Sequence, residues 1–517
     1  MLVVERDSLT SVFFVRALLL IVSGALLSFA FPPLGWWPLA LALGPLIVLT
    51  ANSLRARDAF WPGFFFGLGF FAVHLLWLPE SFAPYSGGFF WLLFPPLVAL
   101  LGVFWGIVTL VARALGGRGV GTLWLLPAFW VMMEWARTQG PFAFPWGVLG
   151  YIWVGTPLSQ AADVAGVYGL SLMTLAVLSL AVSPLVYHPF ARFTPRLAWF
   201  CALLVVASWL GYGTFRLRTI TLSAPETAVL VQGSTDPYAR AGSLEDVDNE
   251  IKLYQDLTVQ ARQELETPPS LVVWPEGVVL DGSLGQGVGR EQSLQQSVGA
   301  TDLITGGASY DQGLYFNSVY SLADGSVLSR YDKRYLVPFG EYFPLTEVLR
   351  PVYSVVFGWF GFEFLQGRTP GARTSVLELP GSQVGAYICY ESVFPQIART
   401  MTARGAEVLV NISNDAWFGF GQGARQHFYM GTLRAIETRR YLLRDGNDGV
   451  TALVDPLGQV RSELPRGERG ALTVRYGLRT GLTPYVRFGD LLIVWLLIYA
   501  VLVVVVRRRA LGKAAFS

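Results

Sequence analysis

Three side chains capable of nucleophilic chemistry follow apolar segments in the second half of the chain. Glu276 comes just after the run LVVW, Lys333 follows a predicted hairpin strand, and Cys389 ends the run GAYI. A thiol is a strong nucleophile as the thiolate, and a neighbouring base produces that form by taking the proton. A lysine ammonium can stabilise the oxyanion of a tetrahedral intermediate. Together these residue types suit acyl transfer through a thioester.

Taken singly, each of these residues has an ordinary structural interpretation. A cysteine often packs as a small buried hydrophobe, a glutamate after a proline can begin a helix or turn, and a lysine at a charged strand end is usually solvated. His427 could partner the cysteine in a Cys-His enzyme, although a structural hydrogen bond is the commoner role for such a histidine. The spacing alone therefore identifies no site.

Composition places the chain among membrane proteins. Of its 517 residues, 53% are hydrophobic and 14% are charged, against roughly a quarter charged in ordinary soluble domains. The net charge of +2 gives no indication of nucleic-acid binding. Cys201 lies in a hydrophobic segment, so we expect no disulfide and a free thiol at Cys389. The three histidines do not cluster with the cysteines, so we expect no metal site and no cofactor.

Eight apolar segments are candidate membrane-spanning helices, each of which needs roughly 20 mostly apolar residues. We predict them at residues 12–31, 36–51, 59–79, 88–112, 121–138, 163–187, 197–215 and 488–506. The first is not expected to be a cleavable signal, because six more segments follow it and no small-residue cleavage site is clear.

Positive charge in the short loops sets the predicted orientation. Arginines gather before the first segment, in every second loop and after the last segment, at Arg6, Arg55, Arg57, Arg113, Arg118, Arg192, Arg196, Arg507, Arg508 and Arg509. The intervening loops nearly lack lysine and arginine. Both termini are therefore predicted to be cytoplasmic, and the long segment before the eighth span is predicted to lie on the far side.

Residues 220–486 have a different pattern, in which apolar strands alternate with helices. Strands are predicted at 227–234, 270–277, 303–310 and 407–413, and helices at 245–266, 394–406 and 423–444. Hairpins are predicted at 323–325, at 381–382 and within 449–460. These elements favour a layered α/β domain with a mixed sheet. The aromatic stretch 351–364 is expected to be a loop that covers the site or enters the membrane interface.

A series of motifs resembles the apolipoprotein N-acyltransferase family, the membrane-embedded branch of the nitrilase superfamily. Within residues 220–486 these are WPEG (274–277), YDKRYLVPFGEY (331–342), YICYES (387–392), NISNDAWFG (411–419) and RQHFYMGTLRAIETRRYLLR (425–444). In the apolar parts they are FAFPPLGWWPLA (29–40), EWARTQGPFAFPWGVLGY (134–151), AGVYGLSL (165–172) and TPYVRFGD (483–490). The resemblance covers nearly the whole chain, in the family's order.

The resemblance implies a polytopic α-helical bundle of eight spans, with a nitrilase-like α-β-β-α sandwich inserted between spans seven and eight. The expected parts are a membrane domain (1–219), a periplasmic catalytic domain (220–486), and an eighth helix with a cytoplasmic tail (487–517). The expected location is the bacterial inner membrane.

The resemblance also implies roles for individual residues. The superfamily's Glu-Lys-Cys triad matches Glu276, Lys333 and Cys389. Supporting or substrate-binding positions are expected at Glu341, Tyr390, Glu391, Trp417 and Trp146. The implied reaction is a ping-pong transfer from the sn-1 position of a phospholipid, through a thioester, to the α-amine of a lipoprotein's diacylglyceryl-modified N-terminal cysteine. The expected partners are these two lipid substrates and the membrane, without nucleic acid, and the protein is expected to be a monomer.

Two other functions fit part of the sequence. A membrane-tethered amidase or nitrilase would use the same triad with water as the second nucleophile, but a small soluble substrate needs no helical bundle. A transporter with an external binding domain would carry more ionisable residues within its spans, and no internal repeat is clear here.

Overall fold

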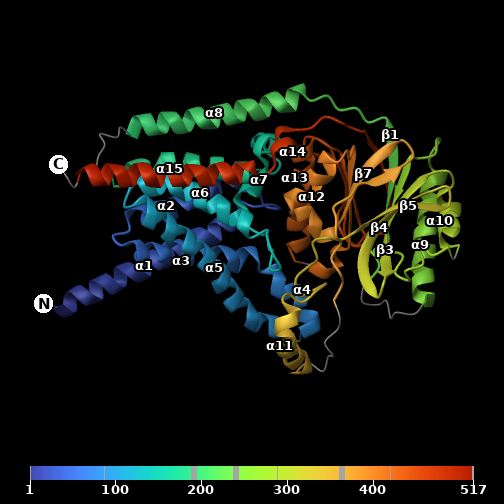
Figure 1. Cartoon of the computed structure of the whole chain (residues 1–517), viewed down its shortest axis with the longest axis horizontal. Coiled ribbons are helices and arrows are strands. Elements are labelled where there is room, and N and C mark those ends of the chain that lie inside the picture. Colours follow the sequence, from blue (N-terminus) through green and yellow to red (C-terminus); the bar gives the residue numbers. More distant parts are fainter. Residues whose placement is uncertain are drawn as a thin grey trace.

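Long apolar helices form one end of the molecule, and a pair of β-sheets with flanking helices forms the other (Figure 1). The computed structural model describes residues 2–86, 88–187, 195–236, 244–287, 289–359, 367–419 and 421–514. The first helix begins, and the last helix ends, at the far end of the helical part, away from the sheets (Figure 1).

The eight predicted apolar segments fall on nine of the described helices, because residues 59–79 are divided between two of them. These helices are α1 (Leu2–Ser28), α2 (Leu43–Asn52), α3 (Phe60–His74), α4 (Trp77–Ser86), α5 (Phe89–Gly116), α6 (Val120–Ala136), α7 (Ala162–Val182), α8 (Pro195–Thr219) and α15 (Leu491–Ala514). In the described part of the chain, five helices are long and apolar enough to cross a membrane, or six if the bent pair α3 and α4 makes one span. Two shorter apolar helices, Trp37–Asn52 and Val120–Ala136, take the places of the second and fifth predicted spans. A bundle of eight spans therefore stays a prediction.

Glycine allows the first helices to pack with their backbones in contact. A Cβ atom on Gly69 of α3 would lie 1.9 Å from the carbonyl oxygen of Ile21 in α1. On the same helix, a Cβ on Gly63 would lie 2.2 Å from the carbonyl oxygen of Trp105 in α5. Small residues at such crossings are a common way to bring apolar helices together within a membrane.

The second half of the chain folds into two six-stranded sheets, ordered β12-β1-β2-β3-β4-β5 and β11-β10-β9-β8-β7-β6. The strands of the first sheet are β1 (Glu226–Gln232), β2 (Leu271–Val273), β3 (Asp302–Asp311), β4 (Leu314–Ala323), β5 (Ser326–Asp332) and β12 (Gly470–Tyr476). Those of the second are β6 (Leu377–Leu379), β7 (Ser382–Ile388), β8 (Val408–Ser413), β9 (Leu442–Gly446), β10 (Thr451–Val454) and β11 (Val460–Leu464). Each sheet pairs three parallel strands with antiparallel neighbours, so both are mixed, as predicted.

The side chains of strand β1 alternate between two environments, and this shows how sheets and helices are layered. Ala228 and Leu230 join a core that also contains residues of the second sheet, so they lie between the two sheets. Val229 and Val231 point the other way and pack with Ile251 of helix α9 (Leu244–Gln263). Because successive side chains of a strand alternate between its two faces, β1 has a sheet on one side and a helix on the other.

Helices cover the outer faces of both sheets. Helix α10 (Arg290–Val298) lies beside α9 on the first sheet, and α12 (Pro395–Ala403) and α13 (Gly423–Thr438) cover the second (Figure 1). The layer order is therefore helix, sheet, sheet, helix. The short helix α14 (Pro484–Phe488) leads from the sheets back into α15.

Two sequence-based assignments were wrong. Helix α13 was predicted to run to residue 444, but it ends at Thr438 because Arg439 adopts a left-handed conformation (φ 53°), and residues from Leu442 onward form β9. The stretch 351–364 was predicted to be a loop, but helix α11 (Thr346–Trp359) includes its first part, and residues 360–364 lie outside the described residues. The three predicted hairpins are confirmed as β4–β5, β6–β7 and β10–β11.

Candidate active site

Cys389 lies at the point where strand β7 ends and a short 3-10 turn, Cys389–Val393, begins. Its φ of 48° is in the left-handed region, which a cysteine adopts only when its surroundings hold it there. The residue is 8% exposed. The strand end thus presents one strained, nearly buried thiol.

Glu391 fixes this turn to the segment that follows strand β5. Its Oε2 accepts a hydrogen bond from the Ile388 amide (2.9 Å). Its Oε1 accepts from the Tyr331 hydroxyl (2.6 Å) and from the amides of Arg334 (2.8 Å) and Tyr335 (3.2 Å). Burial raises the pKa of Glu391, and these donors oppose the rise. The carboxyl group therefore joins the Cys389 turn to the segment after β5, and both of its oxygens accept hydrogen bonds from the protein.

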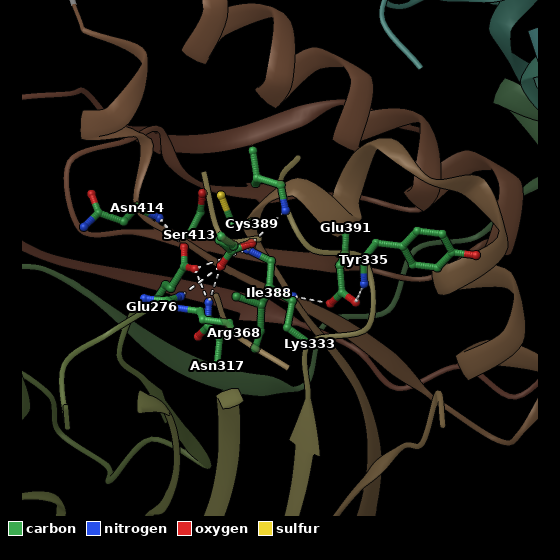
Figure 2. A network of polar contacts seen from close by, with 12 residues as sticks. Glu276, Asn317, Lys333, Tyr335, Arg368, Ile388, Cys389, Glu391, Ser413 and Asn414 are labelled. Atoms are coloured by element: carbon green, nitrogen blue, oxygen red, sulfur yellow. Dashed lines mark hydrogen bonds and ion pairs between the residues drawn. The ribbon is translucent and has the colours of Figure 1, made fainter. Parts of the chain in front are cut away.

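Lys333 is the centre of a buried charge network beside the thiol (Figure 2). Its Nζ lies 3.4 Å from Oε1 of Glu276 and 2.9 Å from Oε2 of Glu341. The Asn317 amide nitrogen donates to both carboxylates, at 2.7 Å to Glu276 and 3.0 Å to Glu341. Glu276 follows β2, Asn317 is on β4 and Lys333 follows β5, so the register of the first sheet brings them together.

Further contacts fix the orientation of both carboxylates. The second oxygen of Glu276 accepts the backbone N–H of Asn414, which comes from the end of β8 in the other sheet (3.0 Å). Glu341 accepts from the Arg368 guanidinium (2.9 Å) and from the Val337 amide (2.9 Å). The groups that bind Glu276 and Glu341 therefore include side chains of the first sheet and of the segment after α11, and a backbone N–H at the end of a strand of the second sheet.

Electrostatics keep the lysine charged and the thiol protonated. Burial alone would lower the pKa of Lys333, but the Glu276 and Glu341 carboxylates outweigh it and raise that pKa well above its usual range. Lys333 and Arg368 hold the pKa of Glu341 at about 2, against the effect of burial. Burial, followed by the negative charge of Glu276, raises the pKa of the Cys389 thiol, and Lys333 opposes this. The resting thiol therefore needs a base before it can act as a nucleophile.

His427 contacts the backbone of the cysteine. One ring nitrogen, Nε2, lies 3.0 Å from the Cys389 carbonyl oxygen, and Nδ1 lies 3.0 Å from a carboxylate oxygen of Asp415. Because a carbonyl oxygen only accepts, Nε2 carries the proton in this contact. The Arg444 guanidinium donates to the other carboxylate oxygen of Asp415 (2.6 Å).

These contacts also bear on metal binding. Within the described part of the chain, Cys389, Asp415 and His427 offer ligand atoms that lie within 4.8 Å of one another. The Arg444 guanidinium already supplies the positive charge at this group, 2.6 Å from Asp415 and 3.1 Å from Nδ1 of His427. A metal dication would have to displace or repel that guanidinium, so the residues present fit a hydrogen-bonded support better than a metal centre.

The predicted aromatic site residues occupy different environments. Tyr390 is buried, donates to the Ala143 carbonyl (2.9 Å), and stacks on the buried Trp146 with ring centroids 6.0 Å apart. Trp146 also stacks on His427 (6.4 Å). Trp417 is 51% exposed. Tyr390 and Trp146 therefore join the loop after α6 to the Cys389 turn, and Trp417 is at the surface.

Sequence reasoning missed three residues of the network: Asn317, Asn414 and Arg368. Asn317 is a buried polar side chain in the otherwise regular strand β4, and that break in the apolar pattern was the available signal. Asn414 acts through its backbone N–H, which no residue type encodes. Arg368 is far from the motifs in sequence and had no signal of its own.

Two family models match the chain. The apolipoprotein N-acyltransferase N-terminal domain matches residues 23–180, and the carbon-nitrogen hydrolase model matches residues 296–480. The second match contains Lys333 and Cys389.

Relatives align over most of the length of the chain. The apolipoprotein N-acyltransferase of Geobacter metallireducens is 32% identical over 503 residues, covering 92% of this chain and 91% of the relative. The apolipoprotein N-acyltransferase of Allorhizobium ampelinum is 33% identical, covering 90% of each chain. Among solved structures, an amidase from Nesterenkonia sp. overlaps 54% of this chain and 98% of its own, with 19% identity and a TM-score of 0.37.

Proposed function

From the fact that the chain belongs to the apolipoprotein N-acyltransferase family, we propose that it completes the lipid modification of lipoproteins. The acyl chain would come from the sn-1 position of a membrane phospholipid and pass to the α-amino group of an N-terminal S-diacylglyceryl-cysteine. The observation that carries this proposal is the nearly buried Cys389 thiol beside the contact network of Glu276, Lys333 and Glu341. Both substrates are membrane-anchored, which gives the apolar helices a role.

The first half-reaction begins with proton transfer. Because the thiol of Cys389 is protonated at rest, Glu276 acts as the general base and takes the proton as sulfur attacks the ester carbonyl carbon. A positioned base typically contributes about 10²–10⁴-fold in rate. Lys333, with the backbone N–H that follows Cys389, stabilises the oxyanion that forms on the carbonyl oxygen.

The remaining steps return every group to its starting state. The C–O bond of the intermediate breaks, Glu276 gives its proton to the departing lysophospholipid oxygen, and a thioester remains on Cys389. The lipoprotein amine then attacks the thioester carbonyl and loses a proton to Glu276. The C–S bond breaks, and the departing thiolate recovers that proton. One ester bond is exchanged for one amide bond, with no external reactant.

Glu341 and Arg368 act through Lys333 in this scheme. Glu341 contacts the ammonium at 2.9 Å and is itself balanced by Arg368 at 2.9 Å. The pair of carboxylates keeps Lys333 charged, so the lysine stabilises negative charge and does not serve as a proton donor. Glu341 is a positioning residue on this account.

Hydrolysis is the second candidate function, and the carbon-nitrogen hydrolase match favours it. A membrane-bound amidase would form the same acyl-enzyme, and water would then release the acid. The two functions differ only in the second half-reaction. The acceptor therefore distinguishes them: a diacylglyceryl-cysteine peptide versus water.

The test is intact-mass analysis of the full-length protein in detergent after incubation with phospholipid. Wild type is expected to gain the mass of one acyl chain, which neutral hydroxylamine removes because it cleaves thioesters. Cys389→Ala is expected to gain nothing, whereas Cys201→Ala, the matched control for the other thiol, should acylate normally. A phospholipid carrying distinct sn-1 and sn-2 chains identifies the donor position, and adding the acceptor peptide should move the chain onto its amine. An unmodified wild type, or an adduct on Cys389→Ala, contradicts the proposal.

The same assay separates Glu276 from His427 as the base. Glu276→Gln keeps the shape of the side chain but cannot take a proton, so acyl-enzyme formation should fall by about 10²–10⁴-fold. His427→Gln loses one contact with the Cys389 backbone and is expected to be slower by only about tenfold. An inactive His427→Gln together with an active Glu276→Gln would assign the base to the histidine.

A further inference from the structure

A basic cavity lies apart from the candidate active site, where α8, the end of α13 and residues 478–484 meet. Its volume is about 440 Å³, and Arg216, Arg439, Arg440 and Arg479 line it. His427, which contacts the Cys389 backbone, lies 12 positions before Arg439, so α13 separates the two places by roughly 18 Å at 1.5 Å per residue. The cavity is therefore not an extension of the site around Cys389.

The end of α13 directs two of these arginines into the junction. Arg439 caps the helix in a left-handed conformation, so the chain turns sharply and Arg440 begins the path to β9. Both residues are nearly buried. Cations are favoured at a helix C-terminus, where the carbonyl groups present negative charge. The local fold thus concentrates positive charge on the cavity wall.

Carboxylates balance only part of this charge. Asp163 of α7 is buried and binds Arg216 (2.8 Å) and Arg439 (2.7 Å) through the same oxygen. The guanidinium groups of Arg440 and Arg479 donate hydrogen bonds to backbone carbonyl oxygens.

Arg440 shows the effect of the crowding. Burial and then repulsion by Arg479 lower the pKa of Arg440 to about 10, and Glu407 opposes this. Four guanidinium groups therefore line the cavity, and the Asp163 carboxylate forms ion pairs with two of them. An anion in the cavity would relieve that repulsion.

The cavity also lies next to the point where the exposed apolar surfaces of α8 and α15 end. On α8, Phe215 is 56% exposed, and Arg216 follows it directly. Leu482 on the cavity rim and Phe488 at the end of α14 are exposed as well, just before the apolar α15 begins. Exposed apolar side chains followed by arginines are typical of the boundary between the hydrocarbon and headgroup layers.

We propose that this cavity binds the phosphate of an anionic membrane phospholipid, at a site separate from the one that carries out acyl transfer. Guanidinium groups bind phosphate oxygens through paired hydrogen bonds, and here α8, the end of α13 and residues 478–484 each supply at least one. The acyl chains of the lipid lie against the exposed apolar surface of α8, next to Leu482. The bound lipid thereby joins α8, α13 and the segment that leads to α15.

The test uses full-length protein, delipidated in detergent, with dioctanoyl phosphatidylglycerol as the probe and native mass spectrometry as the readout. The double variant Arg216→Gln/Arg479→Gln changes the two less buried arginines and leaves Arg439 on Asp163. It is expected to retain one lipid fewer per protein, with that lipid's dissociation constant raised about tenfold or more. Arg218→Ala, on the same helix but outside the cavity, is the matched control and should change affinity by less than about twofold. If the double variant does not fold, Arg479→Gln alone should weaken binding about threefold.

The number of lipids lost in the variant is decisive, because phospholipid also enters the active site under the proposed function. The inference itself does not depend on that function. A folded double variant that retains as much phosphatidylglycerol as wild type overturns it. Two competitors test which part of the lipid the cavity binds. Inorganic phosphate carries only the anion and dioctanoylglycerol only the acyl chains, so each should displace the lipid poorly. Equal displacement by phosphate would indicate a free-anion site, and equal displacement by dioctanoylglycerol a purely apolar one; either result rejects the lipid-phosphate assignment.

Discussion

At the scale of single residues, charge balance explains how so many ionised groups can be buried beside one thiol. Lys333 and Arg368 carry two positive charges, and Glu276 and Glu341 carry two negative ones, so the contact network is neutral. Buried ion pairs repay their desolvation only when their hydrogen bonds are also satisfied, and here Asn317 donates to both carboxylates. Removing one member is therefore expected to affect the others.

Glu341→Gln is expected to lower the stability of the protein in a pH-dependent way. The folded state holds the pKa of Glu341 at about 2, below its ordinary value of 4.5. A lowered folded-state pKa means that the ionised carboxylate stabilises the fold fully above about pH 4.5, and that this contribution is lost as the pH falls toward 2. The variant should thus be less stable than wild type by about 3 kcal/mol at pH 7, with a gap that narrows between pH 4.5 and 2.

Unfolding in detergent, followed by tryptophan fluorescence at pH 7, 4.5 and 3, measures this difference. Glu468→Gln, an exposed glutamate of the same part of the chain, is the control and should change stability by less than about 0.5 kcal/mol. A gap between Glu341→Gln and wild type that stays constant over this pH range would show that the carboxylate is not held ionised by Lys333 and Arg368.

The sequence predicted which residues lie at the site better than it predicted the contacts between them. Glu276 and Lys333 follow strands of the first sheet and Cys389 follows a strand of the second, and the stacking of the two sheets brings these strand ends into one region. Asn317 could not be placed without the register of β4 against its neighbours, because a one-residue shift would turn it to the other face. Arg368 depends on a long-range contact that no local pattern encodes.

At the scale of elements, a glycine in strand β3 sets how closely the strand approaches the segment that carries Glu276. A Cβ on Gly306 would lie 2.6 Å from the Pro275 carbonyl oxygen and 2.7 Å from the Glu276 Cα. Gly306→Ala is therefore expected to push Glu276 away from Lys333, to cost about 1–3 kcal/mol of stability and to slow acyl-enzyme formation. Gly470→Ala in β12 meets no atom within 4 Å and serves as the control.

Intact-mass time courses and unfolding midpoints measure the two effects in the same samples. Gly470→Ala should leave acylation unchanged and alter stability by less than about 1 kcal/mol. Wild-type acylation and stability in Gly306→Ala would mean that the strand has room to yield, so that the glycine does not position Glu276.

The ends of helices were predicted less well where the residues that usually mark them, such as glycine, are absent or misleading. Helix α13 ends without a glycine, because Arg439 itself takes the left-handed conformation that glycine usually supplies. The aromatic and glycine-containing composition of 351–359, with Pro351, suggested a loop, yet Val348, Val352 and Val355 are spaced for one face of a helix. That spacing was the signal that composition concealed.

At the scale of the whole molecule, buried polar contacts fix the sheet-containing part to the helical part. Glu437 of α13 accepts the backbone N–H of Val167 in α7 (2.9 Å), and Trp146 donates to Gln426 of α13 (3.0 Å). These contacts bind α13 to the helical part near both of its ends, and His427, the residue after Gln426, lies against the Cys389 backbone. The Cys389 thiol is therefore held at a set position relative to the helical end.

This arrangement makes the predicted membrane orientation testable with two single thiols. The start of α1 and the end of α15 lie at the helical end, opposite the sheets (Figure 1). If positively charged loops are cytoplasmic, Leu54→Cys, beside Arg55 and Arg57, should face the cytoplasm, and Glu468→Cys, in the exposed β11–β12 turn, should face the periplasm.

In a background that lacks Cys201 and Cys389, a membrane-impermeant maleimide added to spheroplasts should label Glu468→Cys at once. Leu54→Cys should be labelled only after the membrane is permeabilised. The physical reason is that short loops rich in arginine are retained on the cytoplasmic side during insertion, and the folded sheets lie at the opposite end of the helices. Labelling of Leu54→Cys alone before permeabilisation would reverse the predicted orientation and would place Cys389 on the cytoplasmic side, away from the side on which lipoproteins are expected to meet it. Labelling of both thiols before permeabilisation would contradict the prediction that the two positions lie on opposite sides of the membrane.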